Sequence, residues 1–116
     1  MTLVVRRHAR LTPEIHSSAD HAVVTLAGDL DASTAGLLYE QFAALTREGV
    51  VHVALDLEGL IFMDSTGLSV IIAEHKRASS LGGELIIYSP QEPVRKLFEM
   101  TGLMQLLDVK PKNRPR

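Results

Sequence analysis

The sequence predicts an α/β sandwich, in which a mixed, mostly parallel β-sheet with an antiparallel edge hairpin carries three to four helices. Strand-like segments alternate with segments whose apolar residues recur every three or four positions. This alternation favours a parallel sheet built from right-handed strand–helix–strand units. The run at 50–57 is rich in valine and broken only by His52 and Asp56, as in a strand that helices bury on both faces. Two early strand-like runs separated by a polar turn predict the antiparallel hairpin.

The first half of the chain is predicted to hold two strands and one helix. The strands cover residues 11–16 and 22–27, and turn-forming residues at 17–20 join them. An apolar stripe at helical spacing follows, and it consists of Ala35, Leu38, Phe42 and Leu45. We expect Asp31 to cap the N-terminus of this helix and Gly49 to lie at its C-terminal end.

A second helix and a further strand are predicted after Ser65. The helix ends near the glycines at 82–83, and the strand covers residues 85–88. The inner edge of the helix is predicted to consist of Leu68, Ile71, Ile72 and His75. The three-to-four-residue spacing of these side chains is typical of a helix that packs one face on a sheet.

A third helix and a short last strand are predicted at the C-terminal end. Ser89 and Glu92 have the spacing of a capping box, with Pro90 at the first helical position. Gly102 is expected to end the helix, and residues 106–109 are expected to form the strand. The apolar face of this helix is predicted to consist of Val94, Leu97, Phe98 and Thr101.

Length and composition predict one domain of ordinary globular character. The chain has 116 residues, 46% of them hydrophobic and 22% charged, which suits a single domain with its own core. We expect an N-terminal extension at 1–10, the domain at 11–109 and a flexible basic tail at 110–116. No segment has the pattern of a signal peptide or a membrane span, so a soluble, cytoplasmic protein without membrane contact is expected.

Charge and residue types exclude several kinds of site. The formal net charge of −2 argues against nucleic-acid binding, which favours a basic face. The chain has no cysteine, so disulfides, thiolate metal sites and a cysteine nucleophile are excluded. No histidine or carboxylate spacing typical of a metal site is present, and Gly82 and Gly83 are not followed by the residues of a phosphate-binding loop. We therefore expect neither a metal nor a cofactor.

Two loops are the candidates for function, because ligands of open α/β sheets bind beyond the carboxyl ends of the strands. Residues 28–31 follow the second strand, and residues 63–67 lead from the valine-rich strand into the second helix. If these strands are neighbours, the carboxylates of Asp29, Asp31 and Asp64 lie near the Ser65 hydroxyl. Helix capping alone explains Asp31 and Ser65. It does not explain Gly67, which costs about 1 kcal/mol relative to alanine in a helix.

Four segments resemble one known family in order and spacing. They are Gly-Asp-Leu-Asp at 28–31, Asp-Leu at 56–57, Phe-Met-Asp-Ser-Thr-Gly-Leu at 62–68 and Leu-Phe-Glu-Met-Thr-Gly-Leu at 97–103. Together they resemble the STAS domains of anti-sigma-factor antagonists, and the resemblance covers residues 11–109. The chain departs from the family at Ser69, where glycine or alanine is frequent. It also departs at its C-terminal tail, where many relatives continue into a helix packed on the sheet.

The resemblance implies a phosphorylation switch. Ser65 matches the family's phosphoacceptor, and the unphosphorylated protein is expected to bind an anti-sigma factor that is also a serine kinase of the GHKL ATPase fold. That binding releases a sigma factor, phosphorylation switches it off, and a PP2C-type phosphatase resets the serine. The residues expected to bind the partner are Asp29, Asp31, Asp64, Ser65, Thr66 and Gly67.

Other functions fit the sequence less well. A serine hydrolase needs a base beside its serine, and His75 lies ten residues along the helix from Ser65, about 15 Å away at 1.5 Å per residue. We therefore expect no catalytic residue. Nucleotide hydrolysis at the two loops is the alternative from the enzyme class, and an ATPase and GTPase assay would test it. The alternative within the family is a free STAS subunit that docks in an ABC-type lipid-transport or stress-signalling complex.

Overall fold

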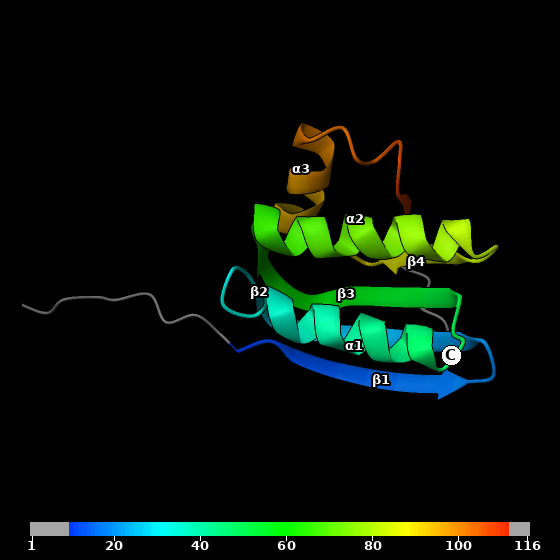
Figure 1. Cartoon of the computed structure of the whole chain (residues 1–116). Helices are drawn as coiled ribbons and strands as arrows, with labels where there is room; N and C mark the ends of the chain where they lie inside the picture. The colour runs from blue at the N-terminus through cyan, green and yellow to red at the C-terminus, as the bar shows by residue number, and fades with distance from the viewer. Residues whose placement is uncertain (1–9, 112–116) are drawn as a thin grey trace, which may run out of the picture.

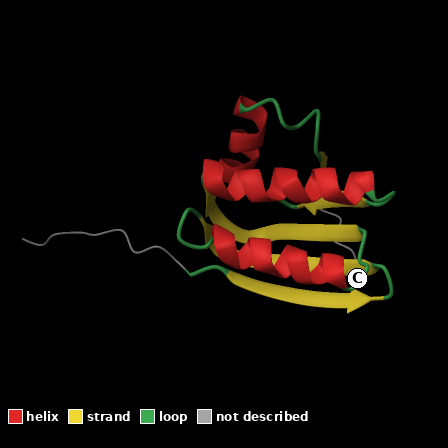
Figure 2. Cartoon of the chain, viewed as in Figure 1, coloured by secondary structure: helices red, strands yellow, loops and turns green. Residues whose placement is uncertain are grey.

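In the computed structural model, which describes residues 10–111, the chain folds into one five-stranded sheet and three helices (Figures 1 and 2). The strands are β1 (Thr12–Ser18), β2 (His21–Leu30), β3 (His52–Met63), β4 (Glu84–Tyr88) and β5 (Asp108–Lys110). The helices are α1 (Ala35–Arg47), α2 (Ser65–Ser80) and α3 (Glu92–Met100). The predicted element order and fold class are confirmed. The N-terminal extension and most of the basic tail lie outside the described residues.

The strands follow one another across the sheet in sequence order. β1 pairs with β2 in the antiparallel sense, and β2, β3, β4 and β5 are parallel neighbours. Each helix therefore connects two adjacent parallel strands. α1 and α2 lie side by side across one face of the sheet (Figure 1), and α3 packs against β3.

The core lies between the sheet and these helices. Alternate residues along β2 and β4 are buried there, as period-two strands require. The predicted helical stripes supply the other half of the core, although Ile72, His75 and Leu97 are only half-buried there. The prediction that Thr101 lies on the apolar face is wrong, because Thr101 is exposed. Side chains that are completely buried include Val24, Leu26, Leu38, Leu55, Ile71, Ile87 and Phe98.

Glycines end the helices as predicted. Gly49 has a φ of 83°, and the amide of the next residue, Val50, donates to the carbonyl of Leu45 at 3.0 Å. Gly102 has a φ of 74°, and the amide of Leu103 donates to the carbonyl of Phe98 at 2.9 Å. This hydrogen bond back across the last helical turn needs a left-handed residue, for which glycine carries no steric penalty.

β3 is longer than the predicted strand at 50–57. It continues to Met63, and Gly59 and Met63 still pair with Ala27 and Leu30 of β2. A Cβ on Gly59 would lie 3.1 Å from the Cβ of Ala27, so glycine allows β2 and β3 to approach closely there. The exposed Glu58 and this glycine interrupt the apolar pattern, and the register with β2 shifts here, between Thr25 and Ala27, before the pairing continues.

The predicted start of the third helix is wrong. The helix begins at Glu92, and Gln91, not Ser89, precedes it as the N-cap residue. Ser89 has a φ of 56° and donates its amide to the carbonyl of Lys110 at 2.9 Å. An N-cap residue normally has an extended backbone, which Ser89 does not have. Lys110, which the sequence analysis assigned to the flexible tail, is the last residue of β5 and pairs with Tyr88 of β4.

Candidate functional site

The two predicted loop segments meet at one end of the sheet, although residues 28–30 belong to β2 and not to a loop. β2 and β3 are parallel neighbours, which was the condition left open by the sequence, so their carboxyl ends lie together. The amide of Asp64 donates to the carbonyl of Leu30 at 3.2 Å, which joins the end of β3 to the end of β2. Figure 1 shows the N-terminal ends of α1 and α2 at this same end, on the left of the view. We call it the Ser65 end.

Asp64, and not Ser65 as predicted, caps α2. Its carboxylate accepts hydrogen bonds from the amides of Thr66 at 2.9 Å and Gly67 at 3.1 Å, and its backbone is extended. These are the two amides that an N-cap side chain reaches. Ser65 is therefore the first helical residue, with its side chain exposed to solvent. The expected accessibility of Ser65 is confirmed, although its expected position in the helix is one residue off.

Thr66 is exposed to solvent, like Ser65. Its β-branched side chain is therefore not confined by the fold. Ser69 is exposed as well, and its hydroxyl donates to the carbonyl of Ser65 at 2.9 Å. Accessibility alone therefore does not distinguish Ser65 from Thr66 as a modification site.

Gly67 is required by close packing. A Cβ at this position would lie 2.5 Å from Cγ of Leu30 and 2.9 Å from its carbonyl oxygen. Leu30 is completely buried, so it has little room to move. The glycine lets the first turn of α2 rest directly on the end of β2, which explains a residue that capping does not explain. Gly67 is itself buried.

The loop after β2 is closed by its own side chains. Asp31 accepts from the amide of Ser33 at 2.9 Å and from its hydroxyl at 2.7 Å, and the Thr34 hydroxyl donates to the carbonyl of Asp29 at 2.9 Å. α1 begins only at Ala35, with Thr34 as the N-cap residue. The prediction that Asp31 caps this helix is therefore wrong, because a tight turn separates the two.

The predicted partner-binding residues come together, but at different depths. Ser65 and Thr66 are exposed and Asp64 is half-buried. Asp29 and Asp31 are only 1% and 7% exposed. The carboxylates of Asp29 and Asp31 therefore lie beneath the surface that a partner would meet, and their predicted role in binding stays a prediction.

Two exposed apolar side chains flank these loops and were missed from the sequence. Leu37, in the first turn of α1, is 43% exposed, and Ile61, near the end of β3, is 52% exposed. Leu37 lies off the predicted apolar stripe of its helix, which was the available signal. Exposed apolar groups beside polar loops are typical of protein-binding surfaces. Among residues 10–111, no helix has the length and apolar character needed to cross a bilayer.

Comparisons with known proteins identify relatives of this chain. The sequence model of the STAS domain matches residues 12–114. The anti-sigma F factor antagonist of Paenibacillus polymyxa is 35% identical over 88 residues, which cover 75% of this chain and 75% of that protein. The anti-sigma-B factor antagonist of Listeria monocytogenes is 34% identical over 92 residues, which cover 78% and 80%.

Solved structures show the same fold. A crystal structure of an anti-sigma factor antagonist from Mycobacterium paratuberculosis matches with a TM-score of 0.78 at 22% identity, covering 88% of this chain and 86% of that one. The anti-sigma factor antagonist SpoIIAA in its unphosphorylated form matches with a TM-score of 0.75 at 22% identity, covering 84% and 87%. The family predicted from the four sequence segments is thereby confirmed: this chain belongs to the STAS domain family.

Proposed function

We propose that this protein is an anti-sigma-factor antagonist, which binds an anti-sigma factor through the Ser65 end and thereby releases a sigma factor. The observation that carries the proposal is the exposed Ser65 at the start of α2, fixed in place by the Asp64 cap and by the contact of Gly67 with Leu30. The names of the related antagonists support it. A cytoplasmic location is part of the same proposal, because sigma factors act there.

The proposed partner is an anti-sigma factor that is also a serine kinase of the GHKL ATPase fold. Its kinase activity phosphorylates Ser65, and a PP2C-type phosphatase removes the phosphate. A phosphate adds about −1.5 to −2 charges at neutral pH. The N-terminus of a helix stabilises an anion by about 0.3–1 kcal/mol. Because Ser65 is in the first turn of α2, the domain should keep its fold when the phosphate is added.

Phosphorylation opposes docking for a different reason. A partner that covers Ser65 would also cover the neighbouring apolar groups, such as Ile61, and remove water from the phosphate. A phosphate placed in an apolar interface costs desolvation energy and occupies contact space. Repulsion between unit charges about 6 Å apart, at an effective dielectric near 40, adds about 1–1.5 kcal/mol for each carboxylate of the partner in reach. A loss of affinity of about a hundredfold corresponds to about 2.7 kcal/mol.

Peptide mapping by mass spectrometry tests the phosphoacceptor. The protein is incubated with the cognate kinase and ATP, and modified peptides are assigned. We expect phosphate on Ser65, none on Ser65→Ala and normal modification of Thr66→Ala. The Thr66→Ala variant is the necessary control, because Thr66 is also exposed. Phosphate found only on Thr66 or Ser69 would refute the assignment.

Binding measurements test the switch. Ser65→Ala should bind the kinase and stay bound in the presence of ATP, whereas Ser65→Asp should bind about a hundredfold more weakly, a difference of about 2.7 kcal/mol. Both variants should unfold at the wild-type temperature. Ser80→Asp places the same charge at the far, exposed end of α2 and should bind like wild type. A pull-down that recovers the ATPase of an ABC transporter instead of a kinase would favour the docking-subunit alternative.

A further inference from the structure

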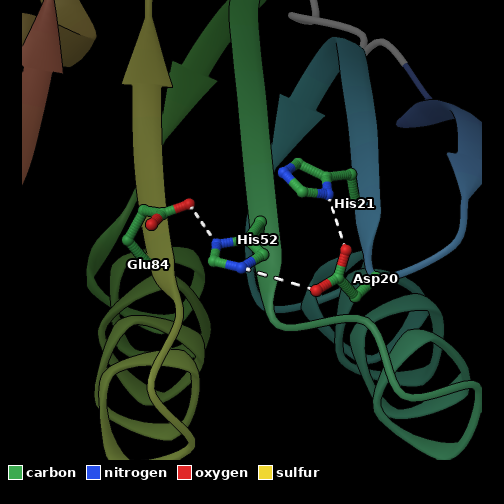
Figure 3. Close-up of polar contacts among 4 residues, drawn as sticks. All are labelled: Asp20, His21, His52 and Glu84. Atoms are coloured by element: carbon green, nitrogen blue, oxygen red, sulfur yellow. Dashed lines mark hydrogen bonds and ion pairs between the residues drawn. The ribbon is translucent and has the colours of Figure 1, made fainter.

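A cluster of polar side chains lies at the opposite end of the sheet from Ser65. Asp20 is in the turn between β1 and β2, and His21 and His52 are the first residues of β2 and β3 (Figure 3). His21 pairs with His52, and His52 with Glu84 of β4, in the register of the parallel sheet. One ligand atom from each of Asp20, His21 and His52 lies within 4.8 Å of the others.

The backbone holds this cluster in place. The carbonyl of Asp20 accepts hydrogen bonds from the amides of Val51 at 3.1 Å and His52 at 3.0 Å. The hairpin turn is therefore tied to the start of β3. The two imidazole rings also stack, with centroids 4.5 Å apart and planes inclined by 25°. The side chains of the cluster thus project from three fixed points.

Nδ1 of His52 makes a hydrogen bond to Glu84, and the other ring nitrogen, Nε2, faces the carboxylate of Asp20. Nδ1 of His52 donates to Oε2 of Glu84 at 2.7 Å, and Nδ1 of His21 donates to Oδ1 of Asp20 at 2.8 Å. Nε2 of His52 lies 3.6 Å from Oδ2 of Asp20. Figure 3 marks this contact with a dashed line. That distance is too long for a hydrogen bond. Because Nδ1 of His52 carries the proton, Nε2 has a lone pair. This lone pair and those of Oδ2 of Asp20 face each other with no proton between them.

The distance between Nε2 of His52 and Oδ2 of Asp20 suits two ligands of one metal ion. Tetrahedral zinc with Zn–N and Zn–O bonds of about 2.0–2.2 Å separates its ligand atoms by about 3.3–3.5 Å, close to the observed 3.6 Å. A histidine that binds a metal also commonly donates its other ring N–H to a carboxylate. The contact of His52 with Glu84 has this form.

We propose that Asp20, His21 and His52 bind one divalent transition-metal ion of the zinc type, that the ion replaces the hydrogen bond between His21 and Asp20, and that Glu84 orients His52. Water completes the coordination, because Asp20 and His21 are exposed. The bound ion would link the β1–β2 hairpin to β3 at the end of the sheet farthest from Ser65. Sequence inspection predicted no metal site, because these ligands have no characteristic spacing along the chain.

Metal titration of the full chain tests this site. Tag-free protein, stripped of metal with a chelator, is titrated with Zn²⁺ by calorimetry, and with Co²⁺ while its visible absorption is recorded. We expect one ion per chain and a Co²⁺ spectrum typical of tetrahedral nitrogen and oxygen ligands. His52→Ala and His21→Ala should each weaken binding by more than about a hundredfold. Glu84→Gln should weaken it by about 10–100-fold, as loss of a carboxylate partner does at other histidine–metal sites.

A histidine on a neighbouring strand provides the matched control. His16 is exposed on β1 and contacts Glu14 at 3.1 Å. It lines the same hollow as His21 and His52 but does not belong to the group whose ligand atoms lie within 4.8 Å of one another. His16→Ala should bind Zn²⁺ like wild type, and each variant is checked for wild-type thermal unfolding without metal. If His52→Ala folds poorly, His52→Gln replaces it. The proposal is wrong if wild type shows no saturable binding, in which case a proton on His52 explains the geometry. It is equally wrong if His16→Ala and His52→Ala lose the same affinity.

Discussion

The two ends of the sheet are held by different kinds of contact. At the Ser65 end, side chains bond to their own local backbone: Asp64 accepts from amides two and three residues ahead, and Asp31 from one two residues ahead. At the other end, the side-chain contact of His52 with Glu84 spans 32 positions of the sequence. The first end is built from turns and helix starts, and the second from the register of neighbouring strands.

This difference decides which end a sequence reveals. A turn or helix start places its functional residues within a short segment, which can be matched as a motif. A cluster made by strand register has no motif, because Asp20 and His21 come close to His52 and Glu84 only after β2, β3 and β4 have paired. The predicted site therefore lay at the Ser65 end, and the metal-ligand cluster became visible only in the folded chain.

The largest loss of stability is expected from a substitution at the end of the sheet that strand register holds together. A Cβ on Gly83 would lie 1.8 Å from the carbonyl oxygen of Val51, which also accepts the amide of Glu84 at 2.9 Å. Neither backbone can move without breaking the start of the β3–β4 pairing. We expect Gly83→Ala to lower the free energy of unfolding by about 3 kcal/mol or more, at the upper end of overpacking effects.

Urea denaturation measures this loss. Gly36→Ala is the matched control, because no atom lies within 4 Å of a Cβ built there. Gly36 is exposed in α1, so its replacement by alanine should stabilise the protein by up to about 1 kcal/mol. A Gly83→Ala protein within 1 kcal/mol of wild type would show that strand register is not the tight constraint described above.

The corresponding substitution at the Ser65 end should cost less. Gly67→Ala brings a Cβ within 2.5 Å of a Leu30 side-chain carbon and 2.9 Å of its carbonyl oxygen. Overpacking of this kind costs about 1–3 kcal/mol, and the helix preference for alanine returns about 1 kcal/mol. We expect a net loss of up to about 2 kcal/mol by urea denaturation. A loss as large as that of Gly83→Ala would contradict the ranking of the two ends.

Most of the fold followed from local pattern. The stripe containing Phe42 predicted a helix that the structure confirms, and Gly49 and Gly102 end their helices as expected. The errors occurred where tertiary contacts override the local pattern. Pairing with β2 extends β3 beyond Leu57, and a contact with the distant Lys110 places Ser89 outside its helix.

The candidate site was predictable in position but not in depth. The linked motifs gave the two loops and the exposed Ser65. They gave neither the burial of Asp29 nor that of Asp31, because a carboxylate in a loop looks the same in sequence whether it faces solvent or its own backbone. For Gly67 the sequence did indicate a constraint, because glycine is unfavourable within a helix. The structure shows that the constraint is close packing against Leu30.

The smallest expected effect concerns the hairpin turn beside the metal-ligand cluster. Ser18 pairs with His21, so Ala19 and Asp20 form a two-residue turn, and Ala19 has a φ of 54°. The left-handed region costs a non-glycine residue about 1–2 kcal/mol, whereas glycine loses about 0.5–1 kcal/mol of extra chain entropy on folding. Ala19→Gly should therefore stabilise the protein by about 0.5–1 kcal/mol.

Thermal unfolding should detect this gain as a rise in Tm of about 2–5 °C, given the slope expected for a domain of this size. Ala73→Gly, at an exposed position within α2, is the control and should lose about 1 kcal/mol. Ala19→Gly leaves Asp20, His21 and His52 unchanged, so its Zn²⁺ affinity should equal that of wild type within a few-fold. A lower Tm for Ala19→Gly would mean that the turn is not strained, and that the register of β1 and β2 alone positions Asp20.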